Sequence, residues 1–162
     1  GMELNEIVYN PVKGRVVPLT SVNDPVFSSE AMGKGVGVVP EEGKVAAPFD
    51  GQVSVAFPTG HAYGLQSDRG AEVLIHVGID TVNLNGEHFH SNVKAGDRIR
   101  KGDVLGTFDP EKIKEAGYDT TTMVIVTNTM AYDAVEQAAV DETYADEALL
   151  NLYKKQETAV KN

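Results

Sequence analysis

Glycine and proline divide this chain into short apolar stretches, and this division constrains the fold more than any other feature. Sixteen glycines and seven prolines occur among the 162 residues, and both residue types favour turns and end regular elements. Many of the stretches between them alternate or are rich in β-branched residues, as strands are. The sequence therefore predicts a mostly β fold, a compact antiparallel sandwich or barrel of many short strands with short helices at its edges.

Besides a short helical turn or loop at 27–32, helices are expected in two places. Segment 109–117 begins with an aspartate cap followed by proline and ends at glycine, which is typical of a short helix. After Thr129 the composition shifts to strong helix formers, and we expect an amphipathic helix within 131–153. Its apolar residues recur at intervals of four: Val140, Tyr144, Ala148 and Leu152. We therefore predict one domain at 5–130 and a helical C-terminal extension at 131–162, which packs on the domain or forms a homo-oligomer.

The composition excludes several classes of protein. The net charge of −10 argues against nucleic acid as a partner, because phosphate backbones attract basic surfaces. The absence of cysteine excludes disulfides, thiolate metal sites and a cysteine nucleophile on this chain. No apolar run is long enough to span a bilayer, and the first residues have no features of a signal peptide. We expect a cytoplasmic protein that does not insert into the membrane.

Two of the four histidines lie on either side of a predicted hairpin. The polar turn 67–70 joins a strand with His61 to an apolar strand with His76. A two-residue turn at its centre places the two residues directly opposite, with Cβ atoms about 5 Å apart. A three-residue loop closed by Gly70 instead forms a bulge, which shifts the register by one residue and could separate the two faces. Both registers agree with the sequence.

A pair of imidazoles on one face is suited to phosphoryl transfer. A neutral imidazole is a good nucleophile towards phosphorus, and the phosphoramidate that forms is labile enough to pass its phosphoryl group on. Positioning and charge stabilisation then account for most of the catalysis. The second imidazole can donate a hydrogen bond to the phosphoryl oxygens, and the hydroxyl of Thr59 could orient it.

A metal site is the rival interpretation. His88 and His90 are spaced to share one face of a strand, an arrangement common at zinc sites, and His76 and Asp80 form another possible pair. A zinc-dependent hydrolase of related β architecture would use such ligands. We expect His88 and His90 to be exposed loop residues instead, and we predict no metal or other cofactor.

The sequence also resembles the glucose-type enzyme IIA domain of the sugar phosphotransferase system. The similar segments follow one another in the order found in that family and cover most of the chain. They are VFSSEAMGKGVGVVP at 26–40, AAPFDG at 46–51, FPTGHAYGL at 57–65, IHVGIDTV at 75–82, VKAGDRIRKGDVL at 93–105 and VIVTNT at 124–129. The chain departs from the common pattern at His88, where family members usually have glycine, and at His90.

The resemblance implies a β-sandwich with two histidines in a shallow apolar depression, and it implies a role for each residue. His76 is the residue that becomes phosphorylated, and His61 stabilises the transfer while Thr59 holds it. Backbone amides around Gly78 and Ile79 help to bind the phosphoryl group. Asp80 shapes the mouth of the site.

The same resemblance implies the partners. The donor is the phosphorylated histidine phosphocarrier protein, and the acceptor is a cysteine of an enzyme IIB domain of a sugar permease. Four residues are candidates for the apolar surface around the site, with a role in the core as the alternative for each: Phe27, Met32, Phe57 and Leu74. A regulator that binds transporters or metabolic enzymes according to its phosphorylation is a further possibility. The chain is expected to be free-standing, with a domain of a fused permease as the alternative.

Overall fold

The computed structural model describes residues 2–138, 142–143 and 147–156. The strands are β1 (Leu4–Tyr9), β2 (Gly14–Pro18), β3 (Lys34–Pro40), β4 (Lys44–Ala46), β5 (Gly51–Ala56), β6 (Ala62–Ser67), β7 (Glu72–Val77), β8 (Phe89–Ser91), β9 (Arg98–Ile99), β10 (Val104–Phe108), β11 (Thr122–Val126), β12 (Tyr132–Gln137), β13 (Glu142–Thr143) and β14 (Ala148–Lys154). The helices are α1 (Pro25–Ser28) and α2 (Pro110–Glu115), with 3₁₀ turns η1 (Leu19–Ser21), η2 (Thr81–Leu84) and η3 (Thr129–Ala131).

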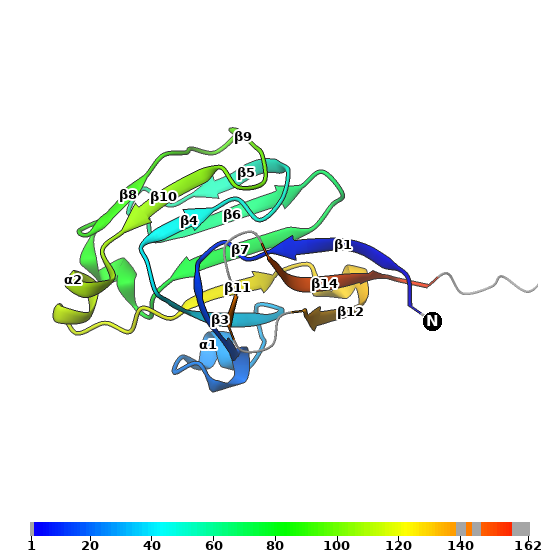
Figure 1. Ribbon diagram of the computed structural model, residues 1–162, viewed down its shortest axis with the longest axis horizontal. Coiled ribbons are helices and arrows are strands. Elements are labelled where there is room, and N and C mark those ends of the chain that lie inside the picture. Colours follow the sequence, from blue (N-terminus) through cyan, green and yellow to red (C-terminus); the bar gives the residue numbers. More distant parts are fainter. Residues whose placement is uncertain (1, 139–141, 144–146, 157–162) are drawn as a thin grey trace, which may run out of the picture.

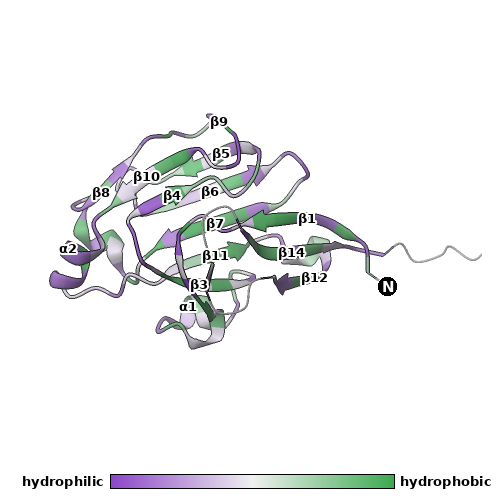
Figure 2. Ribbon diagram, viewed as in Figure 1, coloured by the Kyte–Doolittle hydropathy of each residue, from purple (hydrophilic) through white to green (hydrophobic). Residues whose placement is uncertain are grey.

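These strands form three antiparallel sheets around one core, which confirms the predicted mostly β fold (Figure 1). The largest sheet has eight strands in the order β13-β2-β3-β11-β7-β6-β5-β9, and the smaller sheets have the orders β4-β10-β8 and β1-β14-β12. Buried side chains from all three sheets meet in a single cluster, among them Val8, Ile75, Leu105, Val124 and Leu152. Figure 2 shows apolar residues concentrated in strands such as β1, β11 and β14, whereas α2 is polar.

The β6–β7 hairpin is closed by three residues rather than two. Gly70 has φ of 103° and donates its N–H to the carbonyl of Ser67 at 3.1 Å. Ser67 in turn pairs with Ala71, so Ala62 lies opposite His76. The register with the two histidines directly opposite is therefore wrong, and the bulged alternative is confirmed. Glycine favours this loop because its last residue must adopt a positive φ.

Strand β7 lies in the middle of the large sheet and has apolar cover on both faces. Val73, Ile75 and Val77 point into the main core, whereas Leu74 and His76 alternate to the other face. A second apolar cluster covers that face. It consists of Leu19, Val22, Phe27, Ile79, Met123 and Ile125, with Leu74 packed against it. The chain from η1 to α1 thus shields the face of β7 that carries His76.

The predicted C-terminal helix is wrong where the structure describes the chain. Residues 132–137 and 148–154 are strands, and β14 pairs with β1 on one side and β12 on the other. Ala148 and Leu152 lie in β14, whereas Val140 and Tyr144 fall outside the described residues. Burial of leucines in the main core and pairing with β1 outweigh the helix propensity of this segment. The reason for expecting a homo-oligomer disappears with the helix, and the division at residue 130 stays a prediction.

The short helix predicted at 109–117 is confirmed as α2. Asp109 accepts a hydrogen bond from the backbone N–H of Lys112 at 3.1 Å, and Pro110 is the first helical residue. Gly117 follows the helix with a φ of 96°. Among the residues with described structure, no helix is both long and apolar enough to cross a bilayer.

Candidate active site

The rings of His61 and His76 meet although the two residues are not paired across the hairpin. Their centroids are 5.0 Å apart, with the ring planes at 83°. His61 lies in a bend just before β6, so the alternation of a strand does not determine the direction of its side chain. Its carbonyl accepts the N–H of Val77 at 2.7 Å, which anchors the bend to the end of β7. His61 is 3% exposed and His76 is half-buried.

Each ring is held through its Nδ1 atom. The Nδ1 of His76 lies 2.9 Å from the carbonyl oxygen of Gly78, which can only accept, so Nδ1 carries the proton. The Nδ1 of His61 lies 2.5 Å from Oγ1 of Thr59, as the sequence predicted for this pair. Neither Nε2 atom has a hydrogen-bond partner among the described residues. The arrangement therefore leaves the Nε2 lone pair of His76 available as a nucleophile.

Burial keeps both imidazoles neutral at physiological pH. The pKa of His61 falls from 6.5 to about 4, first because the ring is buried and second because a charge on His76 would repel it. Burial also lowers the pKa of His76, although the hydrogen bond to Gly78 and the carboxylates of Asp24 and Asp80 oppose this shift. A neutral His76 retains the lone pair that a nucleophile requires.

These shifts predict that the protein loses stability in mild acid. A depressed histidine pKa means that the unfolded chain binds more protons than the native state below pH 6.5. The free energy of unfolding should therefore fall as the pH is lowered from about 6.5 towards about 4, the native pKa of His61. Urea unfolding midpoints at several pH values measure this, and His61→Gln should flatten the slope. A midpoint that stays constant through this range would contradict the assignment.

The backbone amides after β7 do not have the role expected of them. The N–H of Gly78 donates to the carbonyl of Thr121 at 3.0 Å, and that of Ile79 to the carbonyl of Asp119 at 2.9 Å. These groups extend the pairing between β7 and β11 and are not available to a phosphoryl group. Gly78 acts through its carbonyl instead, and the exposed Asp80 is near enough to His76 for its carboxylate to favour the charged ring.

Aromatic rings flank the histidine pair. The ring centroid of Phe27 is 5.0 Å from that of His76, and the ring centroid of Phe57 is 5.4 Å from that of His61. Phe27 is only 6% exposed, so it supports His76 from the second apolar cluster and adds little surface for a partner. Phe57 is 40% exposed and contributes to both the site and the surface beside it.

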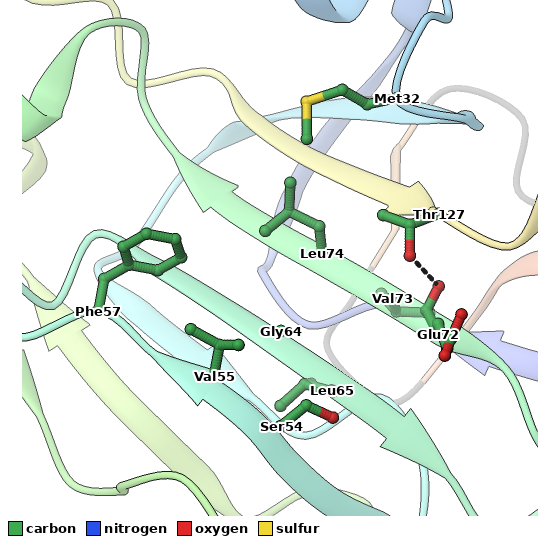
Figure 3. Close-up of a pocket in the computed structure, with 10 residues that line it drawn as sticks. All are labelled: Met32, Ser54, Val55, Phe57, Gly64, Leu65, Glu72, Val73, Leu74 and Thr127. Atoms are coloured by element: carbon green, nitrogen blue, oxygen red, sulfur yellow. Dashed lines mark hydrogen bonds between the residues drawn. The ribbon is translucent and has the colours of Figure 1, made fainter.

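An open apolar groove extends from Phe57 along β5, β6 and β7. Three of the four candidates for the apolar surface, Met32, Phe57 and Leu74, line it together (Figure 3). Sequence reasoning missed Val55, which is 48% exposed, and Gly64, which forms part of the groove floor. Alternation along β5 would have placed Val55 on the core face with the buried Val53, but the register shift between these two residues turns Val55 to the groove, so no local signal in the sequence pointed to it.

The residues considered for a metal site do not converge. His88 has φ of 76° and is half-buried before β8, whereas His90 is exposed within that strand. Among the described residues, no group of three or more His, Cys, Asp or Glu side chains could hold a metal ion. This arrangement gives no support to the zinc-dependent hydrolase.

Comparisons with known proteins agree with this geometry. A family model described as the phosphoenolpyruvate-dependent sugar phosphotransferase system, EIIA 1, matches residues 6–132. The glucose-specific EIIA component of Halalkalibacterium halodurans is 42% identical over 151 residues, which cover 93% of this chain and 87% of that protein. The solved glucose permease IIA from Mycoplasma capricolum superposes with a TM-score of 0.83 at 31% identity, over 90% of this chain and 94% of that one.

Other relatives are longer. The beta-glucoside-specific EIIBCA component of Bacillus subtilis is 49% identical over 147 residues, which are 91% of this chain but 24% of that protein. The chain likewise spans 24% of the Dickeya chrysanthemi EIIBCA component. The fold of this chain is thus that of a IIA protein. The chain belongs to the EIIA 1 family of the phosphoenolpyruvate-dependent sugar phosphotransferase system.

Proposed function

We propose that this chain is a phosphocarrier in sugar uptake. His76 accepts a phosphoryl group from the phosphorylated histidine phosphocarrier protein and passes it to a cysteine of an enzyme IIB domain. The observation that carries the proposal is the hydrogen bond from Nδ1 of His76 to the carbonyl of Gly78, at 2.9 Å, beside a second imidazole. It directs the lone pair of His76 to Nε2, which has no protein partner in the described structure.

The first transfer exchanges one phosphorus–nitrogen bond for another. The Nε2 lone pair of His76 attacks phosphorus, the bond to the donor histidine breaks, and the donor nitrogen takes that electron pair. In the second transfer a cysteine thiolate attacks the same phosphorus, and Nε2 of His76 recovers its lone pair. The proton on Nδ1 stays in place throughout, held by Gly78. The bonds and electron pairs of these two steps balance without a metal ion, because nucleophile and leaving group are both ring nitrogens in the first step.

His61 stabilises the transferred group. A hydrogen bond donated by the Thr59 hydroxyl to Nδ1 of His61 leaves the proton of that ring on Nε2. This N–H then donates to a phosphoryl oxygen, and a donor held in place before the reaction stabilises the charge that develops there. The negative charge of the phosphoryl group also favours the protonated form of His61, which opposes the burial that lowers its pKa.

The groove beside the histidines suits protein partners. Phe57, which packs beside His61, connects the site to the apolar groove that it lines with Leu74 and Met32, and the net charge of −10 favours a basic partner. Because the chain has no cysteine, the acceptor thiol must belong to another domain or polypeptide. The Bacillus subtilis relative is an EIIBCA component, which supports a IIB domain as that acceptor.

The proposal predicts an acid-labile phosphate. Incubation with phosphoenolpyruvate, enzyme I and the histidine phosphocarrier protein should raise the intact mass by one phosphoryl group, stable in alkali and lost in acid. Omission of enzyme I is the control, and addition of a IIB domain should move the phosphate to its cysteine. If the mass does not change while the two upstream proteins phosphorylate a different IIA domain, the proposal is wrong.

A further inference from the structure

The Gly78 carbonyl, which orients His76, lies in a turn with unusual backbone geometry. Gly78 has φ of 85°, and Asp80 adopts the left-handed conformation with φ of 57° although it has a side chain. A carbonyl in such a turn keeps one direction only when the surroundings determine it. The groups that hold this turn therefore decide which nitrogen of His76 carries the proton.

Thr81 holds the turn from beneath. Its side chain is fully buried, and Oγ1 donates to the carbonyl of Val77 at 2.5 Å, which closes the turn across Gly78. A Cβ atom on Gly78 would lie 2.4 Å from Cγ2 of Thr81. The methyl group of Thr81 thus packs directly against Gly78. The hydroxyl group of Thr81 donates a hydrogen bond to the carbonyl of Val77, the last residue of β7.

Asp119 holds the turn from the side of β11. Its Oδ1 accepts from both the N–H and the hydroxyl of Thr121, at 2.8 and 2.7 Å. The carbonyls of these same two residues accept the N–H groups of Ile79 and Gly78. One exposed carboxylate therefore shapes the short segment against which the whole turn is hydrogen-bonded.

We propose that Thr81 and Asp119 are positioning residues, which act on phosphoryl transfer through the Gly78 carbonyl by keeping the proton of His76 on Nδ1. Neither side chain contacts the reacting nitrogen. The effect on the transfer rate rests on the proposed function. The effect on the position of the proton does not, because it is a property of the unphosphorylated protein.

Two pairs of variants test this proposal. Thr81→Val keeps the shape of the side chain but removes the donor, and Thr81→Ser keeps the donor. Asp119→Ala removes the acceptor, and Asp119→Asn keeps an acceptor without the charge. Long-range nitrogen–proton NMR of the His76 ring reports the fraction protonated at Nδ1, and rapid-quench mixing with the phosphorylated phosphocarrier protein reports the rate.

Thr81→Val and Asp119→Ala should each lower the ratio of Nδ1–H to Nε2–H forms, and the transfer rate, about fivefold, the effect of one net hydrogen bond. Thr81→Ser and Asp119→Asn should stay within about twofold of the parent. A native ratio in both Thr81→Val and Asp119→Ala, even with a lower melting temperature, would overturn the proposal. If Thr81→Val does not fold, the Asp119→Ala variant alone tests the proposal, because Asp119 is exposed. A parent protein that accepts no phosphate refutes the proposed function and leaves the NMR comparison valid.

Discussion

Replacing His76 by glutamine should reduce phosphoryl acceptance to the background level. Glutamine keeps a polar side chain of similar reach, but its amide nitrogen has no lone pair that can attack phosphorus. His61 should not substitute, because it is only 3% exposed and its ring is fixed by Thr59. Intact mass after incubation with the complete phosphoryl relay should show no added phosphate on this variant.

The matched control for this variant is His90→Gln. His90 is exposed on β8, in a different sheet, and its replacement should leave both acceptance and stability unchanged. Thermal unfolding of both variants separates loss of the nucleophile from loss of the fold. Phosphate that persists in His76→Gln but disappears in a His61→Gln variant would reverse the roles assigned to the two histidines.

Replacing His61 by glutamine should slow the transfer about 10²–10³-fold, the usual cost of removing one preorganised donor to developing charge. The variant should still become phosphorylated, because His76 and its contact with Gly78 remain. Single-turnover mixing with the phosphorylated donor, followed by transfer to a IIB domain, measures both steps. Thr59→Val should have a smaller effect in the same direction, since it releases the His61 ring without removing it.

A second measurement distinguishes stabilisation by His61 from a general loss of structure. The pKa of His61, about 4 in the unphosphorylated protein, should rise when His76 carries a phosphoryl group, and proton NMR titration can follow it. Loss of structure would not produce this shift. Transfer rates in His61→Gln equal to those of the parent would show that the second imidazole has no part in stabilising the phosphoryl group.

The turns of this protein could largely be predicted from local sequence, and the register of its central hairpin could not. The residues from Ser67 to Gly70 predict a turn, but they are compatible with a loop of either two or three residues. The choice depends on how well the flanking strands bury their faces, which is a property of the whole sheet. The prediction of a helix for the C-terminal segment was wrong for a similar reason. Its helix propensity is local, whereas the pairing of β14 with β1 joins opposite ends of the chain.

At the site, the sequence predicted which residues take part but only some of the contacts between them. The pairing of Thr59 with His61 follows from proximity in sequence, and the structure contains it. The sequence could not predict that the N–H groups of Gly78 and Ile79 donate to the carbonyls of Thr121 and Asp119, because these acceptors lie about forty residues further along the chain. The same separation concealed Asp119.

The sequence by itself determined the class of this protein. The pattern of turns specified a β fold, and the order of its motifs specified the family and the two histidines. Only the tertiary structure decided how those histidines meet. The bend at His61, the bulge at Gly70 and the turn after β7 are each compatible with several local conformations. Packing of β7 between two apolar clusters selects one of them, because burial and hydrogen bonding must be satisfied across the whole sheet at once.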